Sequence, residues 1–196
     1  MKIDSRNNRI LFIASLIILL AASRGPWLRP YIHGFDATLA IFFAGGVYLR
    51  RYVYSLPFLL GAGLVDYLAV RSGVSSWCIT PAYGFLVPTY LAVWCGGIKI
   101  DSLNFSKISR PGFLLTVLLV SGTAAFWIST ASFHLLSGYY EPSQFWERFA
   151  RSHNYYPKYV GSLFGYVFAF VGIATSIDKA RLLFQKKNEG AVNLNP

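Results

Sequence analysis

The sequence has few charged residues. Asp, Glu, Lys and Arg make up 13% of its 196 residues, whereas hydrophobic residues make up 55% and aromatic residues 17%. Soluble domains carry about 25% charged residues, so this composition excludes an ordinary water-soluble domain and indicates lipid as the main surroundings. No Pro- or Ser-rich linker interrupts the chain, and its length predicts a single domain, residues 1–196.

Several motifs of enzymes and metal proteins are missing. The sequence has no GxxxxGK[ST] phosphate loop, so the chain cannot hydrolyse ATP by itself. It has two cysteines and three histidines without HxxxH-type spacing, whereas a protein zinc site needs three or four clustered ligands. The formal charge of +10 comes from Lys and Arg in the gaps between apolar runs. This placement argues against a nucleic-acid partner and is typical of a protein in a lipid bilayer.

Long apolar runs separated by short polar breaks predict an all-α integral membrane protein. In hydrocarbon every backbone donor and acceptor must be satisfied internally, so runs without period-2 alternation are interpreted as helices. Six membrane spans are expected, at residues 10–28, 36–50, 53–70, 81–98, 112–136 and 157–177. A further, amphipathic helix is expected from Pro142 to Ser152, in the long break before the last span.

The distribution of Lys and Arg predicts the orientation. Twice as many of these residues fall on the side of the two termini as on the opposite side. The positive-inside rule therefore predicts that both termini are cytoplasmic and that the protein is a multi-pass protein of the inner membrane. Cys78, His33, Asp36 and the loop from Ser137 to Lys158 are then expected at the outer face.

The two cysteines have different interpretations. Cys95 lies up the helix that follows Cys78, and at about 1.5 Å per residue the two sulfurs are roughly 20 Å apart, which excludes a disulfide within the chain. Cys95 is interpreted as a small buried hydrophobe. Cys78, at the outer face, is a candidate nucleophile or a ligand to a soft or borderline metal. Since no co-ligands cluster nearby, the metal interpretation needs a metal that brings its own other ligands.

Polar and aromatic residues near the expected outer face are further candidates. Asp66 lies inside the third apolar run, where a carboxylate has either a role in a site or a structural partner. Asp36 is expected to be the N-cap of the second span, and His134 to have a structural role. The aromatic loop that contains Tyr139 and Tyr140 forms either an interfacial belt or a lid over a large, partly apolar ligand.

Small residues favour close helix packing in the second span. Ala40-x-x-x-Ala44, followed by Gly45 and Gly46, lets another helix approach closely. The favoured interpretation is packing within the chain, and the alternative is a docking surface for a partner.

The segments VSSWCITPAYGFLVPTYLAVWCGG and HGFDATLAIFFAGGVYLRR resemble a known family, the BtuM-type cobalamin-specific substrate-binding (S) components of energy-coupling factor transporters. The resemblance covers most of the chain in length, number of spans and the cysteine between the third and fourth spans. Its specific part is the Cys78 segment. The family also carries an AxxxA-like motif on the first helix for its coupling protein, whereas the strict motif here is Ala40 to Ala44 in the second span.

The resemblance implies binding of vitamin B12 (cobalamin) at the outer face, with the Cys78 thiolate as an axial ligand to cobalt. The partners would be a transmembrane coupling (T) protein and two ATP-binding-cassette ATPases. The protein would be primarily a transporter subunit. As a side activity, Cys78 would displace cyanide from cyanocobalamin. The other residues expected around the cobalamin are Trp77, Thr80, Tyr83, Phe85, His33, Asp66, Tyr139 and Tyr140.

Two other functions are compatible with the sequence. One is a membrane-embedded cysteine transpeptidase or protease of the exosortase type, in which Cys78 would act with a histidine, His134 or His153, and an arginine, Arg148 or Arg151. Against it, Pro81 and aromatic residues follow the thiol, where a peptide backbone would need small residues. The other is a purely structural membrane subunit, which would tolerate Cys78→Ser.

Overall fold

A computed structural model describes residues 6–25, 36–102 and 111–192. This part of the chain is all-α, as the sequence predicts. Six long helices and the short α6 follow one another as α1 (Arg6–Arg24), α2 (Thr38–Leu49), α3 (Leu56–Arg71), α4 (Leu86–Ser102), α5 (Pro111–Leu136), α6 (Phe145–Arg151) and α7 (Tyr156–Val192). Short 3₁₀ segments lie between them: η1 (Tyr52–Ser55), η2 (Ser76–Cys78), η3 (Pro81–Phe85), η4 (Pro142–Gln144) and η5 (Ser152–Tyr155).

The described helices include three that are long and apolar enough to cross a membrane. They are Arg6–Arg24, Tyr52–Arg71 and Gly112–Leu136, with mean hydropathies of 1.3, 1.6 and 1.8. The chain is therefore a multi-pass membrane protein. α2 is apolar but has only 12 residues, and nearly all of them are buried inside the protein, as expected for a helix that is hydrophobic on every side.

The helix ends differ from the expected spans in several places. α1 begins at Arg6 rather than at residue 10, α4 runs from Leu86 to Ser102 rather than over residues 81–98, and α7 continues past residue 177 to Val192. Polar residues marked the expected limits at residues 10, 98 and 177, but the stretches beyond these limits contain no proline that would break a helix. The expected amphipathic helix in the last loop is present as η4, α6 and the start of η5.

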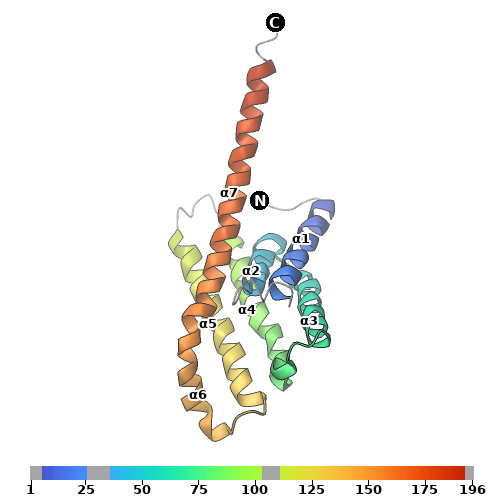
Figure 1. The fold of residues 1–196 in the computed structure, drawn as a ribbon. Helices are drawn as coiled ribbons and strands as arrows, with labels where there is room; N and C mark the ends of the chain where they lie inside the picture. The colour runs from blue at the N-terminus through green and yellow to red at the C-terminus, as the bar shows by residue number, and fades with distance from the viewer. Residues whose placement is uncertain (1–5, 26–35, 103–110, 193–196) are drawn as a thin grey trace.

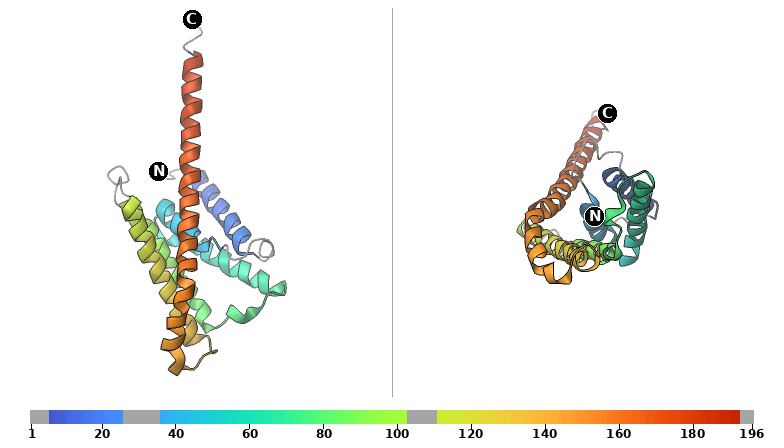
Figure 2. Two further views of the ribbon diagram at one scale, coloured as in Figure 1. Left: turned by 60° about the vertical axis from the view of Figure 1, so that its left-hand side comes forward. Right: turned by 60° about the horizontal axis from the view of Figure 1, so that its bottom comes forward.

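α2 and α4 form the centre of the bundle. α1 and α3 pack together on one side of them, and α5 and α7 on the other (Figure 2). The start of α1 and the end of α7 lie at one end of the molecule, which we call the terminal end, and the C-terminal part of α7 extends beyond the other helices there (Figure 1). The α3–α4 connection and α6 lie at the opposite end.

The core lies where α2, α3 and α4 meet. Phe42 stacks on Tyr90 with ring centroids 4.6 Å apart and meets Phe58 and Trp94 edge-on. The small residues of α2 face this core: Ala40 and Ala44 are 1% and 9% exposed. The AxxxA motif therefore packs within the chain, as the favoured interpretation of the sequence holds.

Candidate functional site

A cavity of about 780 Å³ opens at the end of the bundle where Cys78 lies. Its size falls in the usual range for small-molecule and cofactor sites, about 300–1,000 Å³. All six long helices contribute to its wall. Residues that line it include Arg24, Asp36, Asp66, Trp77, Tyr83, Phe126, Phe133, His134, Tyr140, Lys158 and Tyr159. The cavity therefore combines a polar region with many aromatic rings.

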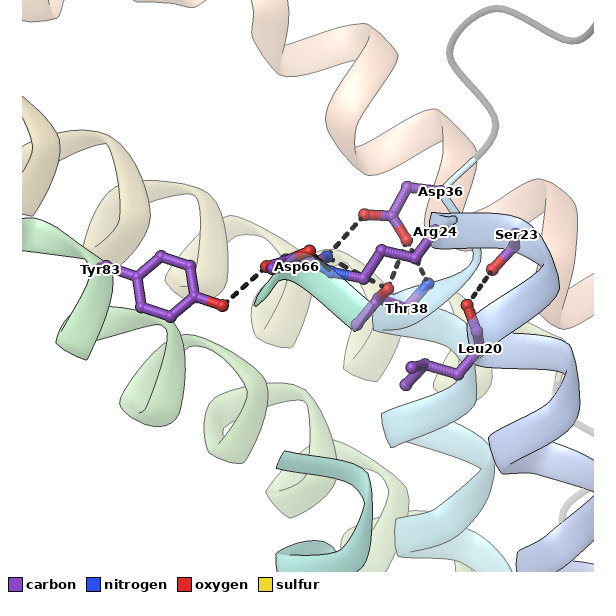
Figure 3. Close-up of polar contacts among 7 residues, drawn as sticks. All are labelled: Leu20, Ser23, Arg24, Asp36, Thr38, Asp66 and Tyr83. Carbon is purple, nitrogen blue, oxygen red and sulfur yellow. Dashed lines mark hydrogen bonds and ion pairs between the residues drawn. The ribbon is translucent and has the colours of Figure 1, made fainter. Parts of the chain in front are cut away.

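The polar region is organised by Arg24, the last residue of α1 (Figure 3). Its Nε and Nη2 donate to the two oxygens of Asp66 at 2.7 and 2.6 Å. Its Nη1 donates to Asp36 Oδ2 at 3.0 Å and, more weakly, to Thr38 Oγ1 at 3.4 Å. The Tyr83 hydroxyl donates to Asp66 Oδ2 at 2.7 Å. One guanidinium thus connects α1, the start of α2 and α3, and Asp66 extends the network to η3.

The burial of these three charges is unequal. The side chains of Arg24 and Asp66 are 12% and 19% exposed, whereas that of Asp36 is 53% exposed. Desolvation makes unpaired charges costly, and the bidentate geometry of Arg24 on Asp66 offsets this cost. Asp66 is therefore a structurally paired carboxylate and also lines the cavity. Both features that its position in an apolar run suggested, a structural partner and a place in a site, are present.

Asp36 was expected to be the N-cap of the second span, but it lies one residue before the N-cap of α2. The N-cap residue of α2 is Ala37, one position later than predicted. Asp36 Oδ1 instead accepts from the backbone N–H of Thr38 at 2.8 Å and from the Thr38 hydroxyl. The carboxylate thus supports the first turn of α2 from just outside the helix and still contacts Arg24.

The Cys78 segment forms part of the cavity rim. Ser76–Cys78 is a 3₁₀ turn, closed by a hydrogen bond from the Ile79 N–H to the Ser76 carbonyl at 2.8 Å. Trp77 and Ile79, the chain neighbours of Cys78, both line the cavity. The Cys78 side chain itself lies outside the described part of the structure.

The aromatic loop is attached to this rim. The ring of Tyr139 stacks on that of Trp77, with centroids 4.9 Å apart and planes at 14°. The Tyr139 hydroxyl also donates to the Trp77 carbonyl at 3.0 Å. Phe133 of α5 also packs against Trp77, with ring centroids 5.2 Å apart. The loop between α5 and α6 therefore supports the backbone immediately before Cys78.

The cavity brings together only some of the residues that the sequence singled out. Asp66, Trp77, Tyr83 and Tyr140 line it. Tyr139 contacts it through Trp77. Thr80 and Phe85 are not among the lining residues: Thr80 Oγ1 is buried without a hydrogen-bond partner in the described chain, and Phe85 is 42% exposed. His33 lies outside the described residues.

His134 lines the cavity and is held by a hydrogen bond. Its Nε2 lies 2.8 Å from Ser152 Oγ, and Ser152 Oγ donates its own proton to the Arg148 carbonyl at 3.0 Å. His134 Nε2 must therefore be the donor to Ser152. This contact joins the end of α5 to the α6–η5 segment, which is the structural role expected for His134.

The two arginines of the loop make contacts with other residues of the loop. Arg148 lies over the ring of Tyr140, 4.3 Å from its centroid, and donates to Gln144 at 3.0 Å. Arg151 pairs with Glu147 one turn earlier on α6, at 2.5 Å. Neither side chain lines the cavity.

Arg24 lines the cavity but was not expected there from the sequence, in which it was treated as a charge at the end of the first span. A usable signal was present: Arg24, Asp36 and Asp66 fall near the same ends of three consecutive apolar runs. Opposite charges at the same depth of adjacent spans are expected to pair.

Within residues 6–25, 36–102 and 111–192, no group of three or more His, Cys, Asp or Glu residues is placed to hold a metal ion. Comparison with models of known protein families and with curated proteins finds no match to this chain.

Proposed function

We propose that this membrane protein binds cobalamin at the outer face of the cytoplasmic membrane as the S component of an energy-coupling factor transporter, with the Cys78 thiolate as axial ligand to cobalt. One observation supports this most directly: the residues on either side of Cys78, Trp77 and Ile79, line a cavity of about 780 Å³. A thiolate in this turn would be adjacent to a space large enough for much of a corrinoid.

The chemistry of the ligand fits a single protein sulfur. A corrin supplies four equatorial nitrogens to its cobalt, so the protein needs to add only one soft axial ligand. The aromatic rings of Trp77, Phe133 and Tyr140 offer apolar surface for the macrocycle. Thiolate coordination would replace the axial cyanide of cyanocobalamin, which leaves as the anion.

Transport needs an energy source outside this chain, since the sequence has no phosphate-binding loop. A transmembrane coupling protein with two ATP-binding-cassette ATPases would supply it. Because Ala40 and Ala44 are buried in the bundle, the coupling protein would contact a surface other than this AxxxA motif.

The alternative, a cysteine transpeptidase of the exosortase type, has less support. It needs a histidine and an arginine beside the thiol, but neither Arg148 nor Arg151 lines the cavity, and Arg151 pairs with Glu147. His134 lines the cavity, but its Nε2 is used by Ser152.

Visible absorption of purified protein tests the proposal. Wild-type protein supplied with cyanocobalamin should purify coloured, and its absorption bands should shift as sulfur replaces cyanide on cobalt. Cys78→Ala should lose this shift, whereas Cys95→Ala, the matched control on α4, should keep it. Bound cyanocobalamin with an unshifted spectrum, or the same spectrum from Cys78→Ala, would overturn the role of Cys78. No bound cobalamin at all would overturn the proposed function.

A further inference from the structure

At the Arg24 end of the cavity, two carboxylates share a single cation. Asp36 and Asp66, which we call the carboxylate wall, share one guanidinium, that of Arg24. Lys158 also lines the cavity, yet it makes no ion pair with either carboxylate. Arg24, Asp36 and Asp66 together therefore carry one negative charge, and Lys158 balances it only over the cavity lining as a whole.

The hydrogen bonds of the wall leave acceptors free. Two ionised carboxylates offer about eight lone-pair sites. Asp66 uses three of them, for two Arg24 contacts and one from Tyr83. Asp36 also uses three, for Arg24 and the two donors of Thr38. Each carboxylate keeps spare acceptor capacity with respect to the described residues.

The donors of the wall, by contrast, are nearly used up. The hydroxyl protons of Tyr83 and Thr38 are both donated to the carboxylates. Nε and Nη1 of Arg24 are occupied, and one proton of Nη2 remains after its bond to Asp66. A ligand group that approaches this wall meets acceptors and negative charge.

We infer that the carboxylate wall is a specificity-determining subsite that accepts the neutral carboxamides of a corrinoid and rejects carboxylates at the same positions. This inference rests on the proposed function. The rim of cobalamin carries primary amides, which donate two hydrogen bonds each. A carboxylate in place of an amide loses both donors and meets a like charge in a partly desolvated wall, which is unfavourable.

Derivatives of cyanocobalamin test this on the full-length protein. The probes are cyanocobalamin, its three monocarboxylic acids, in which one propionamide is hydrolysed, and their methyl esters. Dissociation constants are measured by calorimetry in detergent at neutral pH. At least one acid should bind wild-type protein about 10- to 100-fold more weakly than cyanocobalamin. The same acid should bind at least about tenfold more weakly than its own methyl ester, which carries an uncharged group at the same position of the corrin.

Substitution of the wall separates charge from shape. In Asp36→Asn the ratio of dissociation constants for that acid and cyanocobalamin should fall to within about threefold. The matched control is Glu147→Gln, which removes one negative charge from α6. Glu147 pairs with Arg151, and neither residue lines the cavity. It should keep the wild-type ratio.

The outcomes distinguish this inference from the proposed function. Equal binding of cyanocobalamin and all three acids by wild-type protein overturns the inference and leaves cobalamin binding intact. The inference is also overturned if each acid binds wild-type protein as tightly as its ester, a comparison that needs no variant. It is overturned as well if Asp36→Asn still binds the acid much more weakly than cyanocobalamin. Failure of wild-type protein to bind any corrinoid overturns both.

Discussion

Arg24 connects three helices through two carboxylates, and its removal would leave both without their cation. Arg24 and Asp66 are largely buried, so the attraction between them acts in a medium that screens charge poorly. Breaking a buried pair by removing one partner is more damaging than replacing the whole pair, because the remaining charge stays desolvated.

Arg24→Gln should therefore lower the free energy of unfolding by about 2–3 kcal/mol. In a chain of this size that corresponds to a fall in melting temperature of roughly 5–10 °C, measured in detergent by differential scanning fluorimetry. Arg51→Gln is the control, since the Arg51 side chain is exposed and lies between α2 and η1, outside the cavity lining. Equal melting temperatures for Arg24→Gln and wild type would contradict the role of the Arg24 network in stability.

Tyr139 should affect ligand binding through Trp77. Tyr139→Ala removes both the ring stack on Trp77 and the hydrogen bond to its carbonyl, whereas Tyr139→Phe removes only the hydrogen bond. Each contact is worth about 0.5–1.5 kcal/mol. We expect the dissociation constant for cyanocobalamin to rise about tenfold in Tyr139→Ala and about threefold in Tyr139→Phe. Unchanged affinity in Tyr139→Ala would show that the backbone before Cys78 is ordered without the loop.

The residues of the site were predictable where their chemistry was unusual for their surroundings. A carboxylate in an apolar run identified Asp66, and aromatic residues beside a lone thiol identified Trp77 and Tyr83. The sequence indicates the pairing of Arg24 with Asp66 only through the similar depth of the two charges, because the pairing also depends on α1 and α3 packing side by side. Thr80 and Phe85 were expected at the site because they follow Cys78, but adjacency in the chain does not determine which side chains line a cavity.

At the scale of elements, the crossing of α2 and α4 depends on glycine. A Cβ atom on Gly97 would lie 2.2 Å from the Phe43 carbonyl oxygen and 2.8 Å from the Val47 nitrogen. These are backbone atoms, which cannot move aside as a flexible side chain can. The two helices touch backbone to backbone, and only hydrogen fits at this position.

Gly97→Ala should therefore lower the free energy of unfolding by about 3 kcal/mol or more. The yield of monodisperse protein and its melting temperature measure this. The control is Gly63→Ala on α3, where a Cβ atom meets nothing within 4 Å and helix propensity favours alanine by up to about 1 kcal/mol. A melting temperature for Gly97→Ala equal to that of Gly63→Ala would mean that α2 and α4 separate easily.

Helices were the most predictable elements, because apolar runs in a chain with few charges have one stable backbone conformation in lipid. Their ends were less predictable. α7 continues past Ile177 to Val192 because polarity marks where a helix leaves the membrane and not where it stops. η2 and η3, which turn the chain at Cys78, carry no periodic pattern and follow from local turn geometry.

At the scale of the whole molecule, the α3–α4 connection, which contributes Trp77 and Ile79 to the cavity lining, lies at the opposite end from the start of α1 and the end of α7 (Figure 1). At the terminal end the Arg9 guanidinium donates to the Tyr54 hydroxyl at 2.8 Å, which brings the start of α1 next to η1. The basic residues Arg50 and Arg51 lie beside η1 at this end. The excess of Lys and Arg there predicts that this end is cytoplasmic and that the cavity faces outward.

Cysteine labelling tests this orientation. In a background with Cys78→Ser and Cys95→Ala, single cysteines are introduced as Trp146→Cys on α6, where the side chain is 76% exposed, and as Arg51→Cys at the terminal end. A membrane-impermeant maleimide should label the first variant in intact cells and the second only after permeabilisation. The opposite pattern would place the cavity in the cytoplasm, where it could not collect a ligand from outside, and would contradict both the charge argument and a role in uptake.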